Sequence, residues 1–154
     1  MLTHKQVPPV KLPDLNCPFT FWRLMATLVV KEQEPHLRSE MPGRERVMLV
    51  TKERCNSTYL KADTVTYQPN AQGIEHYHNC ECFIFIIDGE CEVTINGKTH
   101  RARKNTMIYL DPRDKHYIKN TGNKEMVMLE AFAPQSESAP VWTQPNAPNR
   151  WIKA

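Results

Sequence analysis

The sequence has no long hydrophobic run. No stretch of about 18 apolar residues occurs, and the longest apolar segment, residues 19–30, is interrupted by Thr20, Arg23 and Thr27. Because a membrane-spanning helix needs about 20 consecutive apolar residues, we expect no membrane partner. The first residues also lack the apolar stretch of a secretory signal peptide, which predicts a cytoplasmic protein.

The chain also has little excess charge and an odd number of cysteines. The net charge is +3, and the two densest basic groups, within residues 101–104 and 44–52, are not interleaved with aromatic side chains. Single-stranded nucleic acids are bound by cationic grooves that carry stacking aromatics, so we expect no nucleic-acid partner. Five cysteines favour a reducing compartment over a disulfide framework.

Histidines occur at alternate positions within residues 73–89. His76 and His78 are two residues apart, and side chains at i and i+2 of an extended segment share one face. A third histidine, His116, precedes another β-favouring segment. Three neutral imidazoles that leave coordination positions open recur in catalytic metal sites, so the pattern predicts one metal ion held by all three. The alternative is a pair of ordinary polar residues on the solvent face of a strand.

The spacing of these histidines resembles the two motifs of the cupin superfamily. At the anchor positions of the first motif this chain has Asn70, His76, His78, Cys82 and Gly89. At those of the second it has Asn105, Asp111, Arg113, His116 and Asn120. All intervals of the motifs are kept across residues 70–120, and five of the ten anchor residues match. The resemblance implies an all-β jelly-roll barrel.

Four of the substituted anchors concern backbone shape. Asn70 and Asn105 replace glycines, and asparagine is among the few residues that tolerate a left-handed backbone, so both turns are predicted to survive. Arg113 also replaces a glycine, and Asp111 replaces a proline. The loop before His116 is therefore expected to keep its position but not its detailed shape.

Cys82 stands where cupins usually carry a glutamate ligand. A soft thiolate in place of a carboxylate moves the metal preference from manganese towards iron, copper or zinc. Glu81 would occupy the ligand position only if a bulge shifted the register by one residue, and the kept interval to Gly89 argues against that shift. Cys82 is thus a fourth candidate ligand, with an inert thiol packed in the core as an equal alternative.

The chemistry implied by the resemblance depends on the metal. Cys82 followed by Phe83 is similar to the thiol dioxygenases among cupins, in which a three-histidine iron site lies beside a cysteine cross-linked to a tyrosine. Here Phe132 stands at the place of that tyrosine. We predict a metal-dependent enzyme for a small polar molecule, with Cys82, Glu81 and Tyr109 as candidate catalytic residues.

A mononuclear non-haem iron dioxygenase that uses Fe(II) is the preferred interpretation. A redox-inactive metal would instead polarise a carbonyl group, giving a lyase, isomerase or decarboxylase, and Zn, Ni, Cu and Mn remain alternatives to iron. A non-catalytic cupin that binds a small ligand, or one with a vestigial metal site, is a further alternative.

The rest of the pattern predicts a single all-β domain, with a cupin barrel over residues 46–134. Asn96-Gly97 is the strongest short hairpin signal in the chain. The runs expected to form strands are 47–51, 57–62, 64–68, 82–87, 91–95, 98–103, 107–110 and 126–132.

Segments on either side of the barrel complete the prediction. Residues 1–45 are expected to form an irregular arm, with a strand or short helix over residues 24–31 and His36 in a solvated loop. Since cupin N-terminal segments often pack across a partner subunit, a homodimer is expected. The tail, residues 135–154, carries Trp142 and Trp151 and is predicted to wrap the outside of the barrel, with a lid over its mouth as the alternative.

Overall fold

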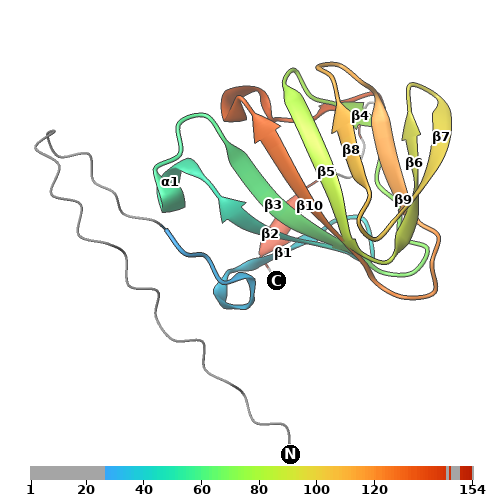
Figure 1. Cartoon of the computed structure of the whole chain (residues 1–154), viewed down its shortest axis with the longest axis horizontal. Helices are drawn as coiled ribbons and strands as arrows, with labels where there is room; N and C mark the ends of the chain where they lie inside the picture. Colours follow the sequence, from blue (N-terminus) through green and yellow to red (C-terminus); the bar gives the residue numbers. More distant parts are fainter. Residues whose placement is uncertain (1–26, 145, 147–149, 154) are drawn as a thin grey trace, which may run out of the picture.

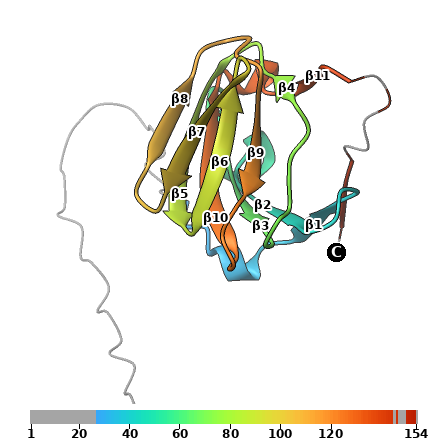
Figure 2. The same cartoon turned by 90° about the vertical axis from the view of Figure 1, so that its right-hand side faces the viewer.

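Two antiparallel sheets face each other and enclose the core (Figures 1 and 2). The computed structural model describes residues 27–144, 146 and 150–153. Within them the larger sheet has the strand order β12 (Trp151–Lys153), β1 (His36–Ser39), β2 (Arg44–Val50), β3 (Lys61–Tyr67), β10 (Met126–Ala133), β5 (Glu81–Asp88) and β8 (Met107–Leu110). The smaller sheet has the order β11 (Val141–Trp142), β4 (His76–Tyr77), β9 (His116–Asn120), β6 (Glu90–Ile95) and β7 (Lys98–Arg103). The predicted all-β jelly roll is confirmed.

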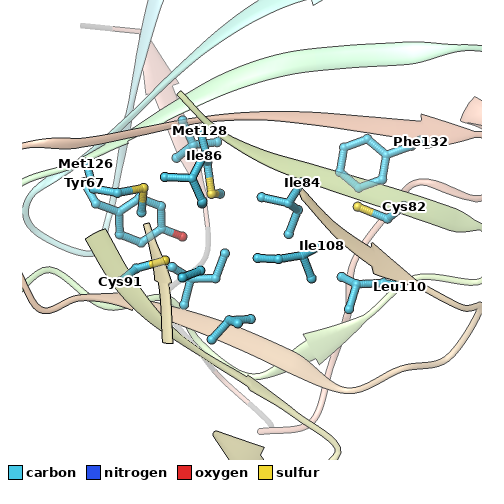
Figure 3. Packing of buried hydrophobic residues seen from close by; sticks show 14 of the residues in the cluster. Tyr67, Cys82, Ile84, Ile86, Cys91, Ile108, Leu110, Met126, Met128 and Phe132 are labelled. Carbon is cyan, nitrogen blue, oxygen red and sulfur yellow. The ribbon is translucent and has the colours of Figure 1, made fainter. Parts of the chain in front are cut away.

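Period-two alternation in the strands builds the core. In β5 the side chains of Cys82, Ile84 and Ile86 are buried, whereas their neighbours Glu81 and Phe83 are exposed. Inward residues of β3, β6, β8 and β10 complete one cluster between the sheets (Figure 3). Each fully buried isoleucine stabilises the fold by roughly 2 kcal/mol relative to an exposed one.

The turns that the sequence marked adopt the expected backbone. Asn70 has φ of 65° and Asn105 has φ of 68°, so asparagine does take the left-handed conformation in place of glycine. Arg113 also adopts positive φ, at 73°. Asn96 and Gly97, both with positive φ, form the two-residue turn of the β6–β7 hairpin, which confirms that prediction.

The region before β3 differs from the sequence prediction. The strand expected over residues 57–62 is mostly a loop that follows a short helix, α1 (Lys52–Cys55). Thr51 caps this helix by accepting a hydrogen bond from the Arg54 N–H, and Asn56 ends it in the left-handed conformation. Such local caps are favoured by threonine and asparagine and compete with extended backbone.

The segment before β2 is more regular than predicted. His36 lies in β1 rather than in a loop, and its Nδ1 is 2.6 Å from Glu45 Oε1. Of the strand or helix expected over residues 24–31, positions 24–26 lie outside the described residues. Residues 27–30 have no regular structure, and a 3₁₀ turn, η1 (Lys31–Gln33), follows.

The tail adds one short strand to each sheet. After a second 3₁₀ turn, η2 (Gln135–Glu137), strand β11 pairs with β4 and strand β12 pairs with β1. The tail therefore extends the sheets instead of only wrapping them. No helix in the described part of the chain is long and apolar enough to cross a membrane.

Candidate metal centre

Three histidines meet inside one end of the barrel. His76 lies in β4 and pairs in register with His116, the first residue of β9, and His78 follows β4. One ring nitrogen from each lies within 4.8 Å of the corresponding atoms of the others, and His78 and His116 are buried. The structure thus brings the three predicted ligands into a group that could hold a metal ion.

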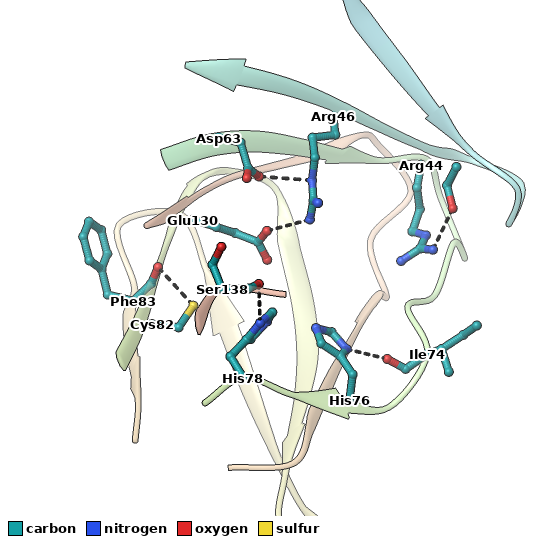
Figure 4. A network of polar contacts seen from close by, with 11 residues as sticks. Arg44, Arg46, Asp63, Ile74, His76, His78, Cys82, Phe83, Glu130 and Ser138 are labelled. Carbon is teal, nitrogen blue, oxygen red and sulfur yellow. Dashed lines mark hydrogen bonds and ion pairs between the residues drawn. The ribbon is translucent and has the colours of Figure 1, made fainter. Parts of the chain in front are cut away.

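Backbone carbonyl groups fix the orientation of all three rings. The Nδ1–H groups of His76 and His78 donate to the carbonyl oxygens of Ile74 and Ser138, each over 2.8 Å (Figure 4). The Nδ1–H of His116 donates to the carbonyl oxygen of Asp114 over the same distance. A histidine that donates from Nδ1 keeps an unprotonated Nε2, which is the tautomer that binds metal. Three lone pairs therefore face a common point, and they cannot hydrogen-bond to one another.

Burial keeps the imidazoles neutral. Loss of hydration, with a smaller contribution from His116, lowers the pKa of His76 to about 2 and that of His78 to about 3. Burial also lowers the pKa of His116. Because only the neutral ring coordinates a metal, protons do not compete for these nitrogens near neutral pH.

Cys82 lies in the core beside the site but outside the histidine group. Within the described residues, the group of close ligand atoms contains the three histidines without this thiol. Burial raises the pKa of Cys82 above its usual range, so the thiol is protonated. Cys82 is the register partner of Phe132, which has no hydroxyl, so a cysteine–tyrosine cross-link cannot form at this pair.

The other two candidate catalytic residues lie on the outside of the barrel. Cys82 points inward, so its neighbour Glu81 points outward and is exposed. Tyr109 is opposite Phe83 on the same outer face, and 53% of its surface is exposed. The structure does not bring Glu81 or Tyr109 to the histidines.

A buried ionic cluster on the opposite sheet was missed in the sequence analysis. Arg46 in β2 forms ion pairs with Asp63 Oδ1 over 3.2 Å and with Glu130 Oε2 over 3.1 Å (Figure 4). The alternation of inward and outward residues along β10 could have revealed Glu130, because it shares the inward face of that strand with Met128 and Phe132. A charge at a core position is unusual unless it is paired.

The two acids of this cluster are cross-strand partners. Asp63 in β3 pairs in register with Glu130 in β10. Burial raises the pKa of Asp63 to about 7 against the opposing effect of Arg46, and the adjacent Glu130 raises it further. Two carboxylates this close do not both ionise easily, so Asp63 takes up a proton at a much higher pH than an exposed aspartate does.

A cavity of about 40 Å³ connects the histidines to the ionic cluster. Its wall includes His76, His78, Arg46 and Glu130, and the tail closes one side with Trp142. The Trp142 and His76 ring centroids are 5.0 Å apart. Trp151 also lines the cavity, so both tail indoles face the site.

Comparisons with known proteins agree with this architecture. A family model described as a cupin domain matches residues 63–132. The polyketide cyclase RemF of Streptomyces resistomycificus superimposes with a TM-score of 0.69 at 12% identity, over 80% of this chain and 89% of that one. This structural likeness concerns the fold alone.

Three sequence relatives carry enzyme names. An L-ectoine synthase of Vibrio campbellii is 37% identical over 67 residues, which is 43% of this chain and 52% of that protein, so the chain matches about half of its length. An L-ectoine synthase of Aliivibrio fischeri strain ES114 is 34% identical over 112 residues, 72% of this chain and 84% of that protein. The polyketide synthase CurC of Streptomyces cyaneus is 30% identical over 131 residues, 81% of this chain and 82% of that protein. Together with the barrel and its histidines, these matches show that the chain belongs to the cupin superfamily.

Proposed function

We propose that this protein is a metal-dependent enzyme that catalyses a non-oxidative reaction, of the lyase or cyclase type, on a small polar molecule. One observation carries the proposal: three buried imidazoles donate from Nδ1 to backbone carbonyls and direct their unprotonated Nε2 atoms to one point. Such preorganised, dehydrated nitrogen ligands fit a divalent transition metal. His76, His78 and His116 would hold it, and Cys82 is not needed.

A metal bound there would polarise a carbonyl or related group of the substrate. The chain supplies the proton transfers. Glu130 lines the cavity, Arg46 forms ion pairs with both Glu130 and Asp63, and the pKa of Asp63 is raised to about 7. Glu130 is the carboxylate that a substrate in this cavity would meet, and it would remove a proton at one atom of the substrate and return it at another.

Aromatic side chains limit the access of water. Phe132 contacts the His78 ring with centroids 4.8 Å apart, and Trp142 covers His76. Exclusion of water strengthens each charge interaction within the cavity and protects reactive groups from hydrolysis. The names of two sequence relatives, an L-ectoine synthase and a polyketide synthase, also favour a non-oxidative reaction.

The dioxygenase predicted from the sequence is the second candidate. The three-histidine set without a carboxylate favours it, because it matches the iron site of the thiol dioxygenases that the sequence resembles. The pairing of Cys82 with Phe132 counts against the thiol-oxidising kind. Fe(II) remains the first metal to test under either candidate, followed by Zn, Ni, Cu and Mn.

Metal analysis of the purified protein tests the proposal. The full chain, purified without added metal, is expected to hold about one transition metal ion per chain. His116→Ala should lose it, while His100→Ala, at an exposed position of β7, should keep it. Cys82→Ser should also keep the metal, because the thiol lies outside the ligand group. Absence of metal from the wild-type protein would contradict the enzyme and favour a ligand-binding cupin.

Oxygen dependence separates the two reactions. Small thiols, diketones, hydroxy acids and amino acids would be incubated with the metal-loaded protein in air and under argon, with turnover followed by NMR and oxygen uptake by electrode. Turnover that persists under argon without uptake supports the lyase or cyclase. Turnover that stops under argon and consumes oxygen in air would replace it with the dioxygenase.

A further inference from the structure

A second arginine in the cavity has no acidic partner. Arg44 is 8% exposed and lines the same cavity as His76 and His78. Its Nη2 donates to Ser39 Oγ over 2.7 Å, but its Nε is buried without a hydrogen-bond partner. Within the described part of the chain no carboxylate forms an ion pair with it. A dehydrated guanidinium group in this state is costly unless an anion joins it.

Arg46 provides the internal comparison. Arg44 and Arg46 are two residues apart in β2, pair in register with Tyr67 and Val65, and point to the same side of the sheet (Figure 4). Arg46 has two carboxylate partners, whereas Arg44 has a hydroxyl and aromatic rings. The same strand thus carries one neutralised guanidinium and one that lacks a counter-charge.

Aromatic and small residues hold Arg44 in place. Its Cζ lies 5.4 Å from the Trp151 ring centroid and 5.8 Å from that of Tyr67. A Cβ atom at Gly73 would lie 3.3 Å from Arg44 Nη1 and 3.2 Å from the Tyr67 hydroxyl, so the absence of a side chain there leaves room for both polar groups. Stacking against rings fixes a guanidinium plane and leaves its edge free for a planar anion.

The charges around the cavity also favour an anion. Arg44, Arg46 and Lys61 line it, and Glu130 is the acid on its wall. Asp63, the register partner of Glu130, does not line the cavity, so three cationic side chains and one carboxylate lie on its wall.

We propose that Arg44 binds a carboxylate group of the substrate, so that the molecule lies in the cavity between this arginine and the rings of His76 and His78. That the bound molecule is a substrate lying beside the histidines rests on the proposed function. Binding of a carboxylate by Arg44 does not. A carboxylate accepts two parallel hydrogen bonds from a guanidinium fork. The cavity of about 40 Å³ restricts the substrate to a small carboxylate whose reacting group is a few bonds from the acid.

Acetate and its neutral isostere acetamide test the carboxylate site. The full-length protein, as purified and again after chelation, would be titrated with each at constant ionic strength, and the indole N–H resonance of Trp151 followed by NMR. Acetate is expected to shift this resonance saturably and to bind at least about tenfold more tightly than acetamide. Equal binding of the two probes overturns the proposal without use of any variant.

Substitutions then test whether acetate binds at Arg44. Arg44→Met should weaken acetate binding about tenfold or more. Arg101→Met, the same change at an exposed position of β7, should leave binding within about twofold. Unchanged acetate binding in Arg44→Met overturns the proposal.

Chelation separates this proposal from the enzyme proposal. If the carboxylate binds at Arg44, removal of metal leaves the acetate dissociation constant within about twofold, and Arg44→Met still loads metal. Acetate binding that disappears on chelation but survives Arg44→Met places the anion on the metal and overturns the role of Arg44. Acetate binding in a protein that never holds metal supports Arg44 while the enzyme proposal fails.

Discussion

At the scale of single residues, neutrality of the histidines has a thermodynamic consequence. In the folded protein the pKa of His76 is about 2 and that of His78 about 3, whereas an unfolded histidine titrates near its ordinary value of 6.5. Below pH 6.5 the unfolded chain therefore binds protons that the folded chain does not. Linkage then requires the free energy of unfolding to fall as the pH falls.

For the metal-free protein we expect a stability loss between pH 6.5 and 4.5. As the pH falls, His76 and His78 each lower the free energy of unfolding by about 1.4 kcal/mol per pH unit. Asp63 acts in the opposite direction, because its pKa is raised from 3.8 to about 7 and the folded chain binds that proton first. The net decrease is thus about 1.4 kcal/mol per unit or more, measured by urea unfolding at a series of pH values.

A histidine variant tests whether His76 causes this pH dependence of the free energy of unfolding. His76→Phe should reduce it by about 1.4 kcal/mol per unit, while His100→Phe, at an exposed site, should leave it unchanged. A stability curve that stays flat over this range in wild-type protein would show that the histidines are not dehydrated as the structure indicates.

The sequence predicted these histidines but not their charged neighbours. His76 and His78 followed from alternation, and His116 from a motif interval. Arg46 and Glu130 come from strands far apart in the chain, and an ion pair between them depends on sheet order, which alternation within one strand does not reveal. Cys82 was predicted to be either a fourth ligand or a thiol packed in the core, and only the coordinates place it in the core outside the histidine group.

At the scale of elements, Gly89 determines how β5 passes into β6. It has φ of +82°, and a Cβ atom there would lie 2.8 Å from both the Glu125 carbonyl oxygen and the Met126 Cα. These are backbone atoms of the neighbouring segment, so they cannot move aside cheaply. The turn therefore needs glycine for its conformation and for its close contact.

Gly89→Ala is expected to destabilise the protein by about 2–4 kcal/mol, from the left-handed backbone and the steric overlap together. Gly97→Ala is the matched control. Gly97 has φ of +79°, and a Cβ atom there would meet no other atom within 4 Å, so only the backbone term of about 1 kcal/mol remains. Urea unfolding of both variants measures the difference, and equal losses would contradict the steric explanation.

Elements with strong local signals were predicted well. The Asn96-Gly97 turn predicted the β6–β7 hairpin, and the apolar run over residues 82–87 predicted the strand that is β5. The prediction was wrong before β3, where residues 57–60 form a loop instead of a strand. The predicted runs 57–62 and 64–68 also left out Asp63, which lies within β3. Its side chain faces inward and is neutralised by Arg46, so a tertiary contact keeps a polar residue within a continuous strand.

At the scale of the whole molecule, the tail closes the site. Trp142 in β11 is the register partner of His76, and its ring packs against the imidazole. Trp151 in β12 covers Arg46, with 4.4 Å between Cζ and the ring centroid. From the sequence, a tail that wraps the outside of the barrel was preferred to a lid over its mouth. Contacts of the two indoles with residues more than 60 positions away leave no local pattern in the sequence.

In the proposed metal-loaded enzyme, Trp142→Ala should open a path to the histidines. We expect metal release to a chelator to accelerate about tenfold, equivalent to about 1.4 kcal/mol, measured by stopped-flow absorbance. Trp151→Ala removes the same side chain from above the arginines and should change the release rate by about twofold or less. Similar acceleration in both variants would mean that general loosening of the barrel, and not cover of His76, controls release.

The site has one wall on each sheet. The histidines belong to the five-stranded sheet, and Arg44, Arg46 and Glu130 belong to the seven-stranded one. A molecule that contacts both walls opposes separation of the sheets, so occupancy raises the free energy of opening. Proteases act on the transiently opened chain, and the lifetime of this protein in a cell would therefore rise with the supply of its own substrate.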